Sequence, residues 1–163
     1  MRIVIIGNSG SGKSTLAAKI AAKRGLPLLE LDSIVWEPGK VAVMRPRAAM
    51  SADLARFVAV HDEWVIEGCY GDLAAELLPH ATELVFLDLS REQCIEHARA
   101  RPWEPHKYAT KEAQDRMLAP LLEWIDGYFT RDDQWSHAAH ARLFDAFAGK
   151  KRRLTRPATD ADA

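Results

Sequence analysis

The sequence has few cysteines and almost no net charge. Its two cysteines, Cys69 and Cys94, lie far apart and lack metal-ligand spacing, so we expect neither a disulfide scaffold nor a zinc site, and a reduced, cytoplasmic compartment is the simplest interpretation. The 163 residues carry a formal net charge of −1, whereas proteins that grip DNA through its phosphates usually present a basic surface. We therefore expect no direct nucleic-acid binding.

Long apolar segments are also missing. No run approaches the roughly 20 apolar residues of a membrane-spanning helix, and the apolar stretch after Met1 and Arg2 covers only residues 3–6, too short for the core of a secretory leader. We expect neither a membrane span nor a leader. Hydrophobic residues make up 48% and charged residues 28%, which is ordinary for a globular domain. We assign residues 1–155 to a single domain and expect residues 156–163 to be a disordered tail.

Alternating strand and helix patterns indicate an α/β fold. The β-branched run of residues 3–6 is typical of a central parallel strand buried on both faces. Ser90 and Gln93 form a capping box, and Pro120 should kink or split the helix expected over residues 111–129. Further strands are predicted near residues 28–31, 64–66, 83–89 and 151–154, and further helices near residues 14–24, 51–61, 72–78, 91–100 and 136–148. This order predicts a parallel sheet covered by helices on both faces.

The most informative motif lies directly after the first strand. Residues 7–14, Gly-Asn-Ser-Gly-Ser-Gly-Lys-Ser, match the pattern G-x-x-x-x-G-K-[ST] in full. Glycines let the backbone curl so that successive amides converge on phosphate oxygens at a helix N-terminus. Lys13 would then reach the β- and γ-phosphates of ATP, and the Ser14 hydroxyl would ligate Mg²⁺. The residues expected to hold the nucleotide are Gly7, Ser9, Gly10, Ser11, Gly12, Lys13, Ser14 and Thr15.

Three further features accompany this P-loop: Asp32 after the second strand, Glu67-Gly68 after the third, and an arginine-bearing segment after the fourth. Over residues 1–103 the chain resembles the small P-loop kinases, the group of adenylate, shikimate and gluconate kinases. It is most similar to the adenylate-kinase-like branch described as DNA topology modulation (FlaR-related) or shikimate-kinase-like proteins. The resemblance implies a P-loop NTPase fold of the nucleoside and shikimate kinase type. Such a fold has three α/β/α layers and a five-stranded parallel sheet in the order 2-3-1-4-5.

The same resemblance implies roles for two carboxylates. Asp32 stands where these kinases place an acidic group near the acceptor or near the water shell of Mg²⁺, where it could orient or deprotonate an acceptor hydroxyl. Glu67 stands where adenylate kinases carry the Asp of Asp-Gly-Phe-Pro-Arg and could hold a metal-bound water. Alternatively, both are solvated carboxylates at strand ends. The chain continues with Cys69-Tyr70-Gly71, so it lacks the arginine with which an AMP kinase grips its acceptor.

Four arginines are candidate ligands of anions. Arg45 and Arg47 lie between the second and third strands, where the acceptor docks in these kinases, and Arg45 is the better candidate for binding it. Arg99 and Arg101 open a lid-like segment over residues 99–116 and could neutralise the transferring phosphoryl group. The alternatives are an ordinary surface position for the first pair and complementation of a helix dipole for the second.

These features predict an ATP-dependent kinase that uses Mg²⁺ and acts on a small acceptor, either a nucleotide or a hydroxyl-bearing anionic metabolite. The alternative is a regulatory P-loop ATPase that acts on a protein or a DNA-linked partner, and a non-catalytic binding module is a third hypothesis. The sequence is compatible with a monomer or a homodimer. His137 and His140 have a spacing seen at metal sites, but no third ligand is near in the sequence, so we expect no metal there.

Overall fold

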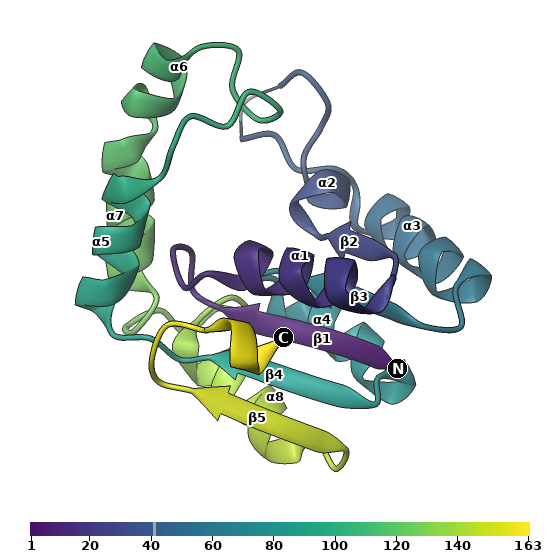
Figure 1. The fold of residues 1–163 in the computed structure, drawn as a ribbon. Coiled ribbons are helices and arrows are strands. Elements are labelled where there is room, and N and C mark those ends of the chain that lie inside the picture. Colours follow the sequence, from purple (N-terminus) through teal and green to yellow (C-terminus); the bar gives the residue numbers. More distant parts are fainter. Residues whose placement is uncertain (41) are drawn as a thin grey trace.

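A parallel sheet lies between two layers of helices in the computed structural model, which describes residues 1–40 and 42–163 (Figure 1). The strands are β1 (Arg2–Gly7), β2 (Leu28–Glu30), β3 (Trp64–Glu67), β4 (Glu83–Leu87) and β5 (Lys150–Leu154). They are ordered β2-β3-β1-β4-β5, and every neighbouring pair is parallel. The expected α/β fold and strand order are therefore confirmed.

The central strand β1 separates two hydrophobic cores. Ile3 and Ile5 contribute to one core, and Val4 and Ile6 to the other, as expected for a strand covered on both faces. The first core packs against α1 (Lys13–Arg24), α5 (Arg91–Ala100) and α7 (Leu118–Gly127). The second core packs against α2 (Asp32–Val35), α3 (Arg47–Val60), α4 (Gly71–Leu77) and α8 (His137–Ala146). The remaining elements are α6 (Lys111–Arg116) and the 3-10 turns η1 (Leu78–His80) and η2 (Asp160–Asp162).

Helix boundaries follow local chemistry at most ends. The side chains of Ser90 and Ser136 cap α5 and α8, and the helix expected over residues 111–129 is divided at Met117 into α6 and α7. Helix α3 begins at Arg47, four residues before the predicted start at residue 51, and the Ser51 hydroxyl inside it donates to Glu76. None of the helices in the part of the chain that the structure describes is long and apolar enough to cross a membrane.

The structure describes residues 156–163, for which we expected a disordered tail, as a segment with defined contacts. Residues 156–163 turn back along α1, where Lys19 Nζ pairs with Asp160 Oδ1 at 2.7 Å and Lys23 Nζ donates to the carbonyl of Ala163 at 2.9 Å. Asp162 is buried, and its hydrogen bonds with Arg156 hold the pKa of its carboxyl well below the usual range. These polar contacts, with the packing of Ala158 and Ala163 against the core, hold the segment in place.

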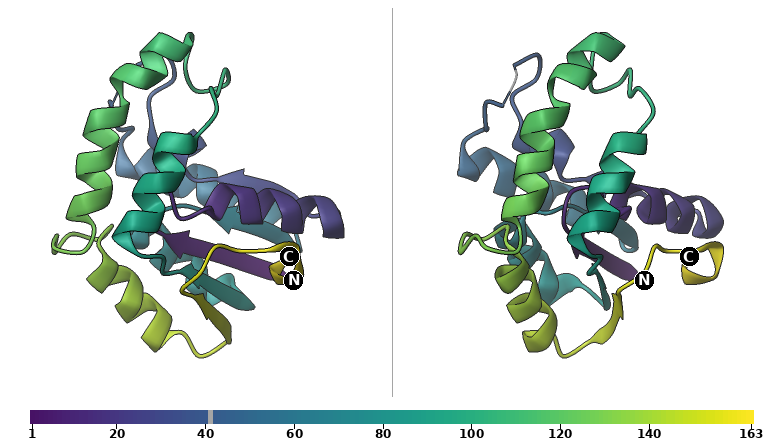
Figure 2. Two further views of the ribbon diagram at one scale, coloured as in Figure 1. Left: turned by 60° about the vertical axis from the view of Figure 1, so that its left-hand side comes forward. Right: turned by 90° about the vertical axis from the view of Figure 1, so that its left-hand side faces the viewer.

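All the motifs of the sequence analysis converge at the carboxyl ends of the strands. β1 leads into the P-loop, β2 into Asp32 and β3 ends at Glu67. Helices α5, α6 and α7 stand beyond this edge of the sheet (Figures 1 and 2). In open α/β sheets, ligands bind in the crevice outside the carboxyl ends of the strands, so this edge is the candidate functional site.

Candidate functional site

The P-loop takes a shape that requires glycine. Gly7, Gly10 and Gly12 have φ values of 152°, 75° and 90°, a region that other residues rarely adopt. A Cβ atom on Gly10 would lie 2.3 Å from the carbonyl oxygen of Cys94, so the loop packs directly on α5. His97 Nδ1 lies 2.8 Å from the Gly10 carbonyl oxygen and donates to it. The curl of the loop is thus fixed from outside by α5.

The loop presents polar groups that its own fold does not satisfy. Ser11 Oγ and Asn8 Oδ1 are buried and have no hydrogen-bond partner among the described residues. Leaving such a group unpaired costs about 1–3 kcal/mol. Lys13 Nζ donates to the Asn8 carbonyl at 2.9 Å and is 9% exposed. Together with the N-terminal amides of α1, this ammonium makes the loop fit for a polyphosphate.

Ser14, at the start of α1, meets Glu67, the last residue of β3. The Ser14 hydroxyl donates to Glu67 Oε1 at 2.8 Å, and Glu67 is only 4% exposed. Burial raises the pKa of the Glu67 carboxyl, the Lys13 ammonium opposes that change, and the Asp32 carboxylate adds to it. Hydroxyl and carboxylate oxygens suit Mg²⁺. The described residues hold no cluster of three or more His, Cys, Asp or Glu able to bind a metal, so phosphates and water would complete the shell of any Mg²⁺ bound here.

Asp32 is the first residue of α2, and its side chain is 48% exposed. Tyr70 donates its hydroxyl to Asp32 Oδ1 at 2.5 Å, and Trp36 Nε1 donates to the Tyr70 oxygen at 3.0 Å. Lys107 Nζ, from the segment between α5 and α6, lies 3.9 Å from Asp32 Oδ2. The contacts of Asp32 with Tyr70 and Lys107 could not be inferred from the sequence, since these two residues belong to segments that only the fold brings together.

Arg45 and Arg47 make contacts within the protein. Arg45 donates to Asp53 at 2.7 Å and to the Ile34 carbonyl at 2.8 Å, which ties α2 to α3. Arg47 pairs with Asp72 and Glu76, which ties α3 to α4. The binding of an acceptor by Arg45 stays a prediction.

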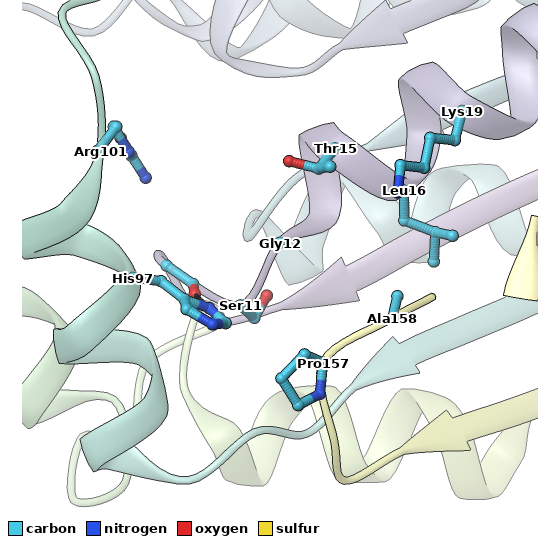
Figure 3. Close-up of a pocket in the computed structure, with 10 residues that line it drawn as sticks. Ser11, Gly12, Thr15, Leu16, Lys19, His97, Arg101, Pro157 and Ala158 are labelled. Atoms are coloured by element: carbon cyan, nitrogen blue, oxygen red, sulfur yellow. Dashed lines mark hydrogen bonds between the residues drawn. The ribbon is translucent and has the colours of Figure 1, made fainter. Parts of the chain in front are cut away.

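The two arginines of the lid-like segment lie differently. Arg101 borders a cavity of about 320 Å³ beside the P-loop (Figure 3), which is in the size range of small-molecule sites. The cavity is lined by Gly10, Ser11, Gly12, Thr15, Leu16, Lys19, His97, Arg101, Pro157 and Ala158. Its floor therefore includes the C-terminal segment that the sequence analysis expected to be disordered. Arg99 is exposed and does not border this cavity; with Arg101 it lines a smaller hollow between α5, α6 and α7.

A buried histidine supports the loop that follows Glu67. His140 Nε2 lies 2.9 Å from the Cys69 carbonyl, which can only accept, so Nε2 carries the proton and the Tyr128 hydroxyl donates to Nδ1 at 2.7 Å. Burial lowers the pKa of His140 to about 4. Burial also raises the pKa of the Cys69 thiol to about 12 and that of the Cys94 thiol to about 11, which leaves both thiols protonated and poorly reactive at neutral pH.

Comparisons with known proteins bear on the fold. No protein-family model matches the chain, and no curated protein matches it either. Among solved structures, it is similar to an unliganded sugar kinase from Janibacter sp. HTCC2649 (TM-score 0.54, 16% identity, 98% of this chain and 87% of that one). It is also similar to deoxyadenosine kinase from M. mycoides with bound dATP (TM-score 0.51, 13% identity, 99% and 94%). A gluconokinase from Sinorhizobium meliloti 1021 aligns with a TM-score of 0.48 at 18% identity, and the alignment covers 96% of this chain and 83% of that one. The chain therefore has the α/β fold seen in small P-loop kinases, with its sheet in the order 2-3-1-4-5.

Proposed function

We propose that this protein is an ATP-dependent kinase that transfers the γ-phosphoryl group to a hydroxyl of a small anionic acceptor. The observation that carries the proposal is the position of Asp32. Its half-exposed carboxylate lies at the same edge of the sheet as the P-loop and is held there by a hydrogen bond from a buried tyrosine. A carboxylate held in this position can orient and deprotonate the hydroxyl of a second substrate.

The donor nucleotide would be held by the P-loop and the cavity beside it. Amides at the N-terminus of α1 and the Lys13 ammonium bind the phosphates, and the cavity bordered by Thr15, Arg101 and Pro157 takes the base and sugar. Bound Mg²⁺ would neutralise phosphate charge. The Ser14 hydroxyl would be its protein ligand, and Glu67, which accepts a hydrogen bond from Ser14, would hold a water of its shell. Arg101 supplies positive charge near the transferring group.

The acceptor would lie between Asp32 and Lys107. As the acceptor oxygen bonds to the γ-phosphorus, the bond from that phosphorus to the β–γ bridging oxygen breaks and ADP leaves, while the hydroxyl proton passes to Asp32 Oδ2 and then to water. Lys107 is the cation 3.9 Å from that oxygen, so it would bind a carboxylate or phosphate of the acceptor. Arg45 and Arg47 are already paired with carboxylates of α3 and α4.

A panel of acceptors tests the proposal. ADP release should be slow with ATP and Mg²⁺ alone and should rise strongly with one member of a panel of nucleosides, nucleotides, shikimate, gluconate and related sugar acids. Asp32→Asn should abolish that stimulation while sparing ATP binding, and Lys13→Ala should abolish ATP binding itself. Full stimulated turnover by the Asp32→Asn variant would contradict the proposal.

A second candidate is a regulatory P-loop ATPase that acts on a protein or DNA-linked partner. The observation that favours it is the exposure of Val43, Met44 and Trp103, which are 43%, 41% and 45% accessible on two segments that flank the crevice. Exposed apolar groups of this size can mark a protein contact. ADP release that no acceptor stimulates would support this candidate.

A further inference from the structure

Trp36, Tyr70 and Asp32 form a hydrogen-bond chain whose direction is fixed. An indole nitrogen can only donate, so the 3.0 Å contact between Trp36 Nε1 and the Tyr70 oxygen uses the phenol as acceptor. The phenolic proton therefore points to Asp32 Oδ1, 2.5 Å away. Asp32 Oδ1 is consequently an occupied acceptor, and Oδ2 is the oxygen left for other partners.

Tyr70 is itself rigidly mounted. It is 4% exposed, and burial raises the pKa of its phenol well above the usual range, so it remains a donor. The edges of Trp36 and Trp135 pack against its ring at centroid distances of 6.4 and 5.6 Å. On the chain before it, the Cys69 carbonyl is held by His140. After it, a Cβ on Gly71 would lie 2.1 Å from the Gln134 carbonyl oxygen, so the backbone is confined on both sides.

The free oxygen of Asp32 faces the acceptor side of the crevice. Lys107 Nζ lies 3.9 Å from Oδ2, and the same ammonium lies 3.4 Å from Glu104 Oε1. A carboxylate that is half exposed and rests at the start of a four-residue helix would ordinarily sample several rotamers. Here one of its oxygens is held by a buried group and the other is left open beside a cation.

We propose that Tyr70 is a positioning residue for phosphoryl transfer: it fixes the rotamer of Asp32 so that Oδ2 alone meets the acceptor hydroxyl. The inference rests on the proposed kinase function. It gives a role to the departure at residues 69–71, where Cys-Tyr-Gly stands in place of the Phe-Pro-Arg of adenylate kinases. In this role the tyrosine would not bind the nucleotide itself. It would act through Asp32.

The kinetic test compares Tyr70→Phe with Trp36→Phe in the full chain, using the acceptor found with the panel. Tyr70→Phe removes only the hydroxyl, and kcat should fall roughly 10- to 100-fold, as expected for losing a hydrogen bond to a charged group. The Kd for ATP, measured by calorimetry, should be unchanged. Trp36→Phe is the matched control, because it disturbs the same cluster but leaves the bond to Asp32, so kcat should fall less than about threefold. Equal losses in both variants, or wild-type turnover by Tyr70→Phe, would overturn the proposal.

A second measurement needs no acceptor. In proton NMR, the buried Tyr70 hydroxyl should give a downfield, slowly exchanging resonance that is absent from Tyr70→Phe. The resonance should move upfield in Asp32→Asn, because a neutral amide oxygen is a weaker acceptor than a carboxylate. If the chemical shift of this resonance does not change in Asp32→Asn, the hydrogen bond from Tyr70 to Asp32 is refuted. If no compound of the panel stimulates ADP release, the kinase function is refuted, whereas the spectroscopic result still holds. The two failures can therefore be told apart.

Discussion

Replacing His140 by glutamine should remove a defined part of the acid sensitivity of the fold. The imidazole is fully buried, and its pKa is about 4 in place of the ordinary 6.5, chiefly because burial disfavours the charged form. Above pH 6.5, the residue is neutral in both the folded and the unfolded chain and adds no pH dependence. Between pH 6.5 and 4, the unfolded chain takes up a proton that the folded chain refuses, so the free energy of unfolding falls as the pH falls.

The gap between the two pKa values sets the size of the effect. Each pH unit between the two pKa values corresponds to about 1.4 kcal/mol. By pH 4, His140 should therefore lower the free energy of unfolding by about 3 kcal/mol in all, with no further decrease at lower pH. This decrease is a large share of the free energy of unfolding of a typical domain, which is about 5–15 kcal/mol. The added proton would go to Nδ1, which accepts the hydrogen bond from the Tyr128 hydroxyl in the folded protein.

Urea unfolding between pH 7.5 and 4 is the assay. The difference in unfolding free energy between the wild type and His140→Gln should be constant above pH 6.5 and should shift in favour of the variant by about 3 kcal/mol on acidification to pH 4. Tyr128→Phe is the matched control: it removes the hydroxyl bonded to Nδ1 but keeps the ring buried, so it should retain the acid sensitivity. Parallel curves for the wild type and His140→Gln would refute the reasoning.

Three further outcomes follow from the site. Gly10→Ala should weaken ATP binding more than about tenfold, because it combines positive φ with a close approach to Cys94 that costs about 1–3 kcal/mol in strain. Gly39→Ala, at a similar φ but with open space around it, should leave calorimetric ATP affinity intact. Lys107→Ala should raise the acceptor KM about tenfold without changing the KM for ATP, as expected for losing one charged contact. Arg45→Ala should lower the unfolding free energy by about 1–3 kcal/mol, because its contacts with Asp53 and the Ile34 carbonyl are lost. Only an accompanying rise in the KM for the acceptor would support the predicted contact of Arg45 with the acceptor.

The parts of the fold that depend on local sequence could be predicted. The β-branched run of β1, the capping box at Ser90 and the division of the helix before Pro120 are all properties of neighbouring residues, and the structure shows each of them. The P-loop could be predicted for the same reason, since its glycines and its lysine all lie within residues 7–14. The strand order came from the resemblance to small kinases, which covers the segments that build the sheet.

The surroundings of Asp32 could not be predicted in this way. Tyr70 lies 38 positions from Asp32 in the sequence, and Lys107 reaches it from the segment beyond α5, so no local pattern connects them. The paired arginines pose the converse problem. The sequence alone does not show that Arg45 is paired, because its partner Asp53 lies further along the chain, in α3. The order of the C-terminal segment could not be predicted because it depends on contacts with distant parts of the chain, namely the Lys19–Asp160 ion pair with α1 and the packing of Ala158 and Ala163 against the core.

The inert state of both native cysteines makes the molecule convenient for site-specific labelling. Because Cys94 is buried and both thiols remain protonated at neutral pH, a maleimide dye should react with them more slowly than with an exposed cysteine. A pair of cysteines placed at two exposed positions, Val60 at the end of α3 and Lys111 at the start of α6, could then carry a fluorescent donor and acceptor without any background substitution. Energy transfer between the dyes would report directly whether α6 approaches α3 when nucleotide is added.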